Sequence, residues 1–186
     1  MGPAIYNWTL TADLKALGPV RHIIAPNWFH DLYLADYVSA YPEATLRGPR
    51  FLQKLKGRGL VGRTFDENPP WADVMSRHDV LGLLTFEEAI FFHEPSETLI
   101  VADFLMNLPT PEDAPFTRAA FTLFGANNRL CVFPLLRLAL LQRNTLRRAA
   151  TQIMKWKPKN VIVGHGLPIV ADATPRLVKA LGWLRP

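Results

Sequence analysis

A short apolar run that ends in a Gly-His-Gly motif is the feature of this sequence that most constrains its fold. Residues 161–163 read Val-Ile-Val and are followed by Gly164, His165 and Gly166. A β-branched run of this kind predicts a buried strand, and the glycines after it predict a loop. The histidine therefore stands where a strand ends, which is a typical position for a metal ligand.

Two other apolar runs end in side chains that also bind metals. Residues 99–102 (Leu-Ile-Val-Ala) lead directly into Asp103, and residues 21–26 lead into a loop that contains His30 and Asp31. Three strands are thus predicted to present polar ligands from their ends.

The residues before Asp103 predict a β-hairpin. Residues 94–97 (Glu-Pro-Ser-Glu) separate two apolar runs and are typical of a turn. A turn at this place pairs Phe92 with Leu99 and sets Glu88 opposite Asp103. Cross-strand partners lie about 5 Å apart, so the two carboxylates must hold a cation, share a proton or diverge into water.

Helical and strand periodicities alternate along the chain, which predicts an α/β sandwich. With 186 residues, of which 49% are hydrophobic, the chain is expected to form a single domain over residues 1–186. Helices are predicted over residues 9–17, 31–40, 116–124, 130–154 and 174–184, and a helical turn over residues 51–55. Strands are predicted over residues 4–8, 20–25, 44–47, 79–84, 88–93, 99–102 and 160–164.

Composition limits the classes of partner and of cellular compartment. A net charge of +5 permits an anionic partner but does not require one, so no nucleic-acid partner is expected. The single cysteine, Cys131, cannot form an internal disulfide and fits a reducing compartment. No signal-like segment and no apolar run long enough to span a membrane are present in the sequence. A cytoplasmic location is therefore expected.

Two stretches resemble the metallo-β-lactamase fold superfamily, and within it an uncharacterised branch. They are residues 17–27 (Leu-Gly-Pro-Val-Arg-His-Ile-Ile-Ala-Pro-Asn) and residues 91–103 (Phe-Phe-His-Glu-Pro-Ser-Glu-Thr-Leu-Ile-Val-Ala-Asp). The resemblance implies a four-layer αββα sandwich and a metal-dependent hydrolase. Few residues precede the first predicted helix, so the sheet is expected to lack an N-terminal edge strand or to be completed by a partner.

The first loop departs from the family pattern. The family carries a His-x-His-x-Asp-His loop, whereas residues 27–31 read Asn-Trp-Phe-His-Asp. The family's second histidine, which precedes the hairpin, is absent, and Glu88 or Glu87 is the only nearby ligand type. Asp103 and His165 match the family directly. The residues that match the family, together with Glu88, give a candidate metal site of four residues: His30, Glu88, Asp103 and His165.

A hydrolytic zinc site needs about three protein ligands and an open position for water. Zinc is the expected metal, and an oxygen-rich ligand set also suits Mn or Fe(II). The leading hypothesis is a hydrolase of an ester, lactone, thioester or similar small molecule, in which Asp31 orients the water or accepts its proton.

Several alternatives stay open. Asp103 and His165 could cap their strands without any metal, and the protein could be a catalytically silent binding or assembly module. A nuclease is disfavoured because no separate nucleic-acid-binding insertion is visible. The apolar residues 130–136 could pack on the sheet or form a homodimer contact.

Overall fold

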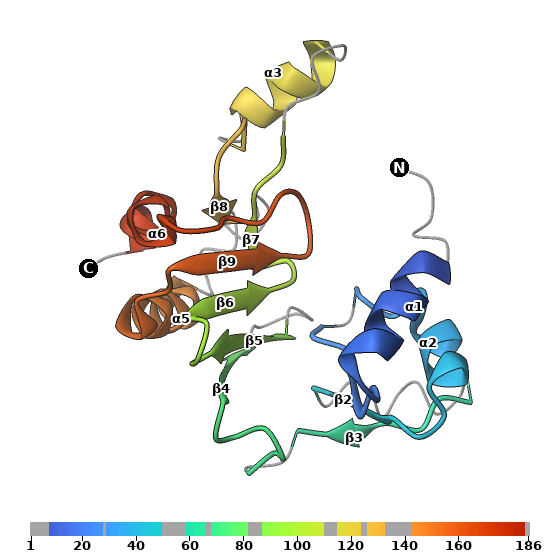
Figure 1. The fold of residues 1–186 in the computed structure, drawn as a ribbon. Helices are drawn as coiled ribbons and strands as arrows, with labels where there is room; N and C mark the ends of the chain where they lie inside the picture. Colours follow the sequence, from blue (N-terminus) through green and yellow to red (C-terminus); the bar gives the residue numbers. More distant parts are fainter. Residues whose placement is uncertain are drawn as a thin grey trace. The chain divides into compact units, whose positions relative to one another are not determined.

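The computed structural model describes most of the chain, as two compact units divided between Glu67 and Asn68 (Figure 1). The predictions for residues 4–7, 51–55, 82–84 and 133–142 lie outside the described residues. The described residues are 8–27, 29–49, 59–65, 68–81, 87–109, 115–123, 126–132 and 143–184.

The N-terminal unit is a small parallel sheet with two helices. Its elements are α1 (Trp8–Leu17), β1 (His22–Ile24), α2 (Leu34–Ala40), β2 (Thr45–Gly48) and β3 (Arg63–Thr64). The strands follow the order β1-β2-β3 and are parallel. A crossover that contains α2 joins β1 to β2, as a parallel pair requires. The predictions of strands at 20–25 and 44–47 and of helices at 9–17 and 31–40 are confirmed, although α2 begins only at Leu34.

The C-terminal unit contains the larger sheet, which has the order β4-β5-β6-β9. The pairs β4–β5 and β5–β6 are antiparallel, and β6–β9 is parallel. A second small sheet pairs β7 with β8. The strands are β4 (Met75–Leu81), β5 (Glu87–His93), β6 (Thr98–Val101), β7 (Leu105–Met106), β8 (Cys131–Val132) and β9 (Asn160–Val163). The helices are α3 (Pro115–Leu123), α5 (Arg143–Trp156), α6 (Ala173–Leu181) and the 3₁₀ turn η4 (Gly182–Leu184).

The predicted hairpin is confirmed, including its register. Phe92 pairs with Leu99, and the neighbouring pair is His93 with Thr98. The parallel pair continues this register across the sheet, because Thr98 also pairs with Asn160.

The main core lies between this sheet and the helices α5 and α6 (Figure 1). Helix α5 turns the buried residues Leu146, Ala149 and Ile153 toward the strands, as its helical spacing predicts. Near the end of α5, the ring of Trp156 stacks on Phe92 with ring centres 5.5 Å apart. Burial of these apolar side chains is the main force that holds the unit together.

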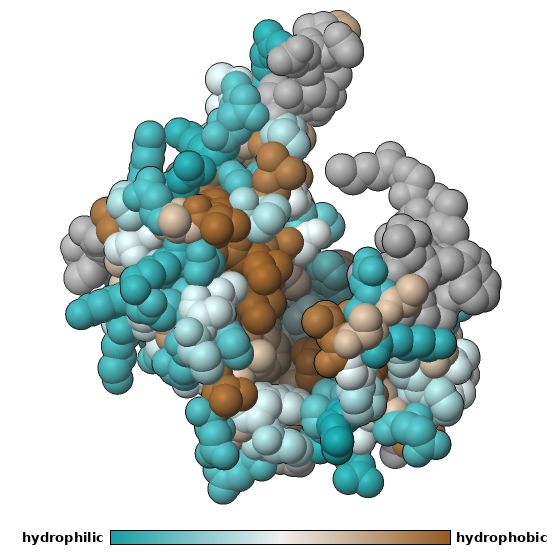
Figure 2. Space-filling model, in the orientation of Figure 1, coloured by the Kyte–Doolittle hydropathy of each residue, from teal (hydrophilic) through white to brown (hydrophobic). Residues whose placement is uncertain are grey.

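On the opposite face of the sheet, β9 exposes an apolar side chain. Along β9, Val161 is buried in the core, whereas its neighbour Ile162 points away from it and is 48% exposed. Figure 2 shows hydrophobic residues gathered over β6 and β9.

Among the described residues, no helix is both long and apolar enough to cross a lipid bilayer.

Three sequence predictions for this unit need correction. The helix predicted over residues 130–154 is wrong at its start, because Cys131 and Val132 form β8 and α5 begins at Arg143. Residues 130–132 are buried, which agrees with the alternative that this run packs inside the protein. Strand β4 begins at Met75 rather than at residue 79. The last helix begins at Ala173 and ends at Leu181, where a 3₁₀ turn follows, and the hydroxyl of Thr174 donates to the carbonyl oxygen of Pro158.

Candidate metal centre

Asp103 and His165 lie side by side. The Nε2 atom of His165 is 2.8 Å from Oδ1 of Asp103. Thr98 and Asn160 are paired, and each lies five positions before its ligand (98 to 103 and 160 to 165), so the two ligands stand at the same level of the sheet. The side chain of Asp103 is 11% exposed and that of His165 is 48% exposed. The pair therefore joins a buried carboxylate to an imidazole that solvent can reach.

The two glycines beside His165 let its loop come close to the Asp103 strand. A Cβ at Gly164 would lie 2.9 Å from the carbonyl oxygen of Ala102, closer than real side chains approach. Gly166 has φ +108°, which L-residues rarely adopt, and a Cβ there would overlap the carbonyl of Asn107. The Gly-His-Gly motif is thus required by the backbone around His165.

Asn107 fastens the His165 loop from the other side. Its backbone N–H donates to the carbonyl oxygen of His165 over 3.1 Å, and its own carbonyl accepts from Leu167 N–H over 3.0 Å. Its side-chain amide donates to the carbonyl oxygen of Leu167 over 2.8 Å. Sequence reasoning missed this residue, and the only signal was a polar residue four positions after Asp103.

Glu88 has a different role from the predicted one. It is fully buried, and Oε1 accepts a hydrogen bond of 2.9 Å from the N–H of Ala102. Oε2 accepts from the N–H groups of Asp103 and Phe104, over 2.9 and 3.0 Å. The chain bends at residues 102–104 after β6 ends, and buried N–H groups released in this way need acceptors. The carboxylate therefore satisfies the backbone beneath Asp103, and we leave Glu88 out of the ligand set.

The other two predicted site residues belong to the N-terminal unit. His30 and Asp31 follow β1 in the loop that leads to α2, and both are partly buried. The loop is shaped by Asn27, which is 1% exposed and whose Oδ1 accepts from the N–H groups of Phe29 (2.9 Å) and His30 (3.2 Å). This is the turn that an asparagine side chain typically forms. The roles of His30 and Asp31 remain predictions, and the geometry that supports a site within one unit is the Asp103–His165 pair.

Two histidines of the larger sheet have other surroundings. His78 lies in β4, where burial lowers its pKa and the charge of Arg148 adds to this, against the opposing effect of Asp79. His93 is at the hairpin turn, and its Nδ1 is 2.7 Å from the hydroxyl of Ser96, which is an exposed hydrogen bond.

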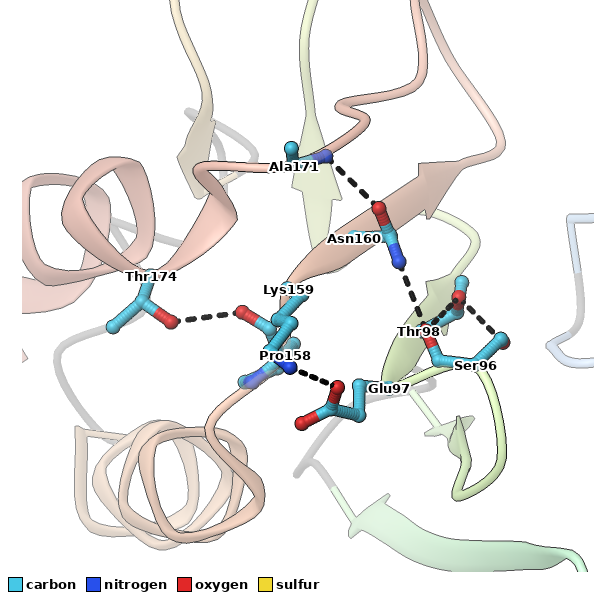
Figure 3. Close-up of polar contacts among 8 residues, drawn as sticks. All are labelled: Ser96, Glu97, Thr98, Pro158, Lys159, Asn160, Ala171 and Thr174. Carbon is cyan, nitrogen blue, oxygen red and sulfur yellow. Dashed lines mark hydrogen bonds and ion pairs between the residues drawn. The ribbon is translucent and has the colours of Figure 1, made fainter.

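A polar cluster fixes the opposite end of strands β6 and β9 (Figure 3). The side chain of Asn160 donates to the carbonyl oxygen of Ser96 and accepts from the N–H of Ala171, both over 2.9 Å. Beside it, Lys159 forms an ion pair with Glu97. These contacts join the hairpin turn to the start of β9 and so hold the register that brings the two ligands together.

In chemical terms, the pair offers one carboxylate oxygen and one imidazole nitrogen, both of them common metal ligands. Such a donor set fits a divalent metal and provides two of the roughly three protein ligands that a hydrolytic zinc site uses. Without a metal, the same atoms form a hydrogen-bonded His–Asp pair.

Comparisons with known proteins identify the fold. No protein-family model matches the chain, and none of the curated proteins matches it. The metallo-β-lactamase DIM-1 superimposes over 95% of this chain and 74% of its own, with a TM-score of 0.56 and 12% sequence identity. TMB-1 matches over 92% and 74%, with a TM-score of 0.54 and 14% identity. The chemotaxis sensor ODP, in a structure described as a peroxy diiron species, matches over 97% and 76%, with a TM-score of 0.58 and 11% identity.

These similarities extend over nearly the whole chain, while the sequence identities are low enough that they establish the fold alone. The order of strands and helices, the hairpin that precedes Asp103 and the strand that precedes His165 also agree with the resemblance found in the sequence. The chain is a mixed α/β protein with the metallo-β-lactamase fold.

Proposed function

We propose that this protein is a metal-dependent hydrolase of the metallo-β-lactamase type. The observation that carries the proposal is the contact of 2.8 Å between His165 Nε2 and Asp103 Oδ1 at the ends of two adjacent parallel strands. Strand ends of this kind are where α/β proteins hold their ligands. The half-exposed imidazole leaves the pair open to substrate and solvent.

Asp103 and His165 would hold the metal, and we propose His30 as a third ligand because it occupies the family's first ligand loop. A bound divalent metal lowers the pKa of a coordinated water toward about 7 and polarises a carbonyl group. Asp31 is proposed to orient the water or accept its proton. The backbone around Asp103 and His165 is held by hydrogen bonds, so these two side chains need little reorganisation to bind an ion.

Zinc is the metal we favour, with Mn or Fe(II) as alternatives because carboxylate ligands suit both. One protein of the same fold is described as a diiron species of a chemotaxis sensor, so the fold is compatible with iron. The proposed substrates are esters, lactones, thioesters or similar small molecules. A cytoplasmic homodimer, the full αββα layering and a missing N-terminal edge strand remain predictions from the sequence.

A second candidate is a catalytically silent binding or assembly module. The observation that favours it concerns Asn27, which stands at the start of the loop where the family has histidines. Its side-chain oxygen is engaged by two backbone N–H groups, which is a structural role. The match to a chemotaxis sensor agrees with a non-hydrolytic use of the fold.

Metal analysis distinguishes the two candidates. The purified protein is loaded with Zn, Mn or Fe(II), passed through a desalting column and measured for bound metal. We expect about one equivalent in the wild type and strong losses in His165→Ala and Asp103→Ala. His93→Ala is a matched control, because it removes a histidine of the same sheet whose side chain bonds to the hairpin turn.

Hydrolysis of p-nitrophenyl esters, lactones and thioesters is then assayed on the loaded protein. Metal binding without any turnover would support the silent module. Negligible metal in the wild type and in both ligand variants would rule out the hydrolase.

A further inference from the structure

We infer that Glu88 is a positioning residue, which fixes the orientation of Asp103 for metal binding without touching the metal. The inference rests on the proposed function, because it assigns Asp103 to a metal. It concerns a buried acidic residue that the sequence alone places among the ligands themselves.

Both carboxylate oxygens of Glu88 are bonded to the backbone. Glu88 has an exposed fraction of 0%, and its two oxygens accept three backbone N–H groups at 2.9, 2.9 and 3.0 Å. The donors belong to three consecutive residues, Ala102, Asp103 and Phe104, which are 14 to 16 positions further along the chain. A long-range contact of this kind defines the shape of the turn, because the three donors lie beyond Val101, where the pairing of β6 with β9 ends.

The turn requires a side chain that only accepts hydrogen bonds. Three donors converge on two acceptor atoms, and a carboxylate is acceptor-only on both. A glutamine has the same size but presents one NH₂ group, which would point a donor at Ala102 N–H or at the N–H pair of Asp103 and Phe104. An unsatisfied buried donor is costly, so the turn would rearrange rather than accept it.

The same hydrogen bonds hold the backbone of Asp103, the proposed ligand. The peptide N–H of Asp103 is bonded directly, and the N–H groups before and after it are bonded as well. On the far side of this turn, Gly164 N–H donates to the carbonyl oxygens of Val101 (2.9 Å) and Ala102 (3.2 Å), which ties it to the His165 loop. With its backbone held on both sides, the Asp103 side chain has few ways to move away from His165. Preorganised ligands of this type bind metal more tightly than mobile ones.

Glu88→Gln tests the inference, with Co²⁺ as the probe metal. Its affinity is measured by calorimetry, and its visible absorption spectrum reports the ligand geometry. We expect Co²⁺ to bind about 10- to 100-fold more weakly than in the wild type, with an altered spectrum. Glu87→Gln is the charge-matched control, since Glu87 is the neighbouring, partly buried glutamate of the same strand.

Loss of stability alone must be separated from loss of positioning. Val80 is fully buried and pairs with Glu88 across β4 and β5, so Val80→Ala loosens the same place without removing an acceptor. We expect Val80→Ala to lower the melting temperature and to leave the Co²⁺ affinity and spectrum unchanged. If Glu88→Gln does not fold, Glu88→Asp replaces it, because it keeps both oxygens but withdraws them by one methylene group, and weaker Co²⁺ binding is again expected.

The outcomes separate this inference from the proposed function. Wild-type Co²⁺ binding that Asp103→Ala abolishes but that Glu88→Gln leaves unchanged would overturn the positioning role and leave the metal site intact. Equal weakening by Val80→Ala and Glu88→Gln at equal loss of stability would also overturn it. No Co²⁺ binding by the wild type would overturn both.

Discussion

Gly166 is the position at which a substitution tests the backbone requirements of the site most directly. We predict that Gly166→Ala strongly lowers the free energy of unfolding. An alanine at φ +108° costs about 1 to 3 kcal/mol of backbone strain. Its methyl group would also overlap the carbonyl of Asn107, and relief of such crowding costs about 1 to 3 kcal/mol. Together these terms give a loss of about 2 to 6 kcal/mol, a large share of the roughly 5 to 15 kcal/mol by which proteins are stable.

Two other glycines separate the terms. Gly18 has φ +126° but open space within 4 Å of the position that a Cβ would take, so Gly18→Ala reports the strain alone. Gly182 has an ordinary helical φ of −56° and open space, so Gly182→Ala is expected to be neutral or to stabilise by about 0.4 to 1 kcal/mol. Urea denaturation of all three variants measures the differences. A Gly166→Ala cost no greater than that of Gly18→Ala would refute the argument that close backbone approach requires the glycine.

Three more predictions concern the C-terminal unit. Burial lowers the pKa of His78 below 6.5, so the unfolded chain binds the proton more tightly and the free energy of unfolding decreases as the pH falls below about 6.5. The urea midpoints at pH 7.5 and pH 5 should therefore differ less in His78→Gln than in the wild type. Asn160→Ala removes the exposed hydrogen bonds to the Ser96 carbonyl, which keeps Thr98 as a donor, and to the Ala171 N–H. It should cost about 0.5 to 1.5 kcal/mol in thermal unfolding, whereas a cost near zero would contradict its role in the register. Ile153→Ala empties a fully buried position and should cost about 2 to 5 kcal/mol in urea, and a cost below about 1 kcal/mol would show that α5 packs loosely.

The parts of the fold with strong local signals could be predicted from the sequence. Turn residues between apolar runs were sufficient to place the hairpin and to pair Phe92 with Leu99. The strands that end before Asp103 and His165 were also predicted, because β-branched runs followed by a polar residue or by glycine leave few alternatives. For the same reason, Asp103 and His165 were the two site residues that the sequence predicted most directly.

What the sequence could not show depends on three-dimensional contacts. Glu88 looked like a ligand because it was predicted to face Asp103, and only the structure reveals that the bend after β6 turns three N–H groups toward it. The run that begins at Leu130 has too many apolar residues for its period to distinguish a short strand from a helix, and β8 was therefore missed. Asn107 could not be recognised because its partners lie about 60 positions away.

The equal spacing of the two ligands from their paired residues has a consequence for how this chain tolerates changes in length. Residues 104–159 lie between the segments 98–103 and 160–165, and their loops could gain or lose residues at modest entropic cost. One residue inserted between Thr98 and Asp103, or between Asn160 and His165, would shift one ligand by about 3.3 Å and turn it to the other face of the sheet. The count of residues along these two short segments, together with the glycine at position 164, therefore decides whether the carboxylate and the imidazole meet.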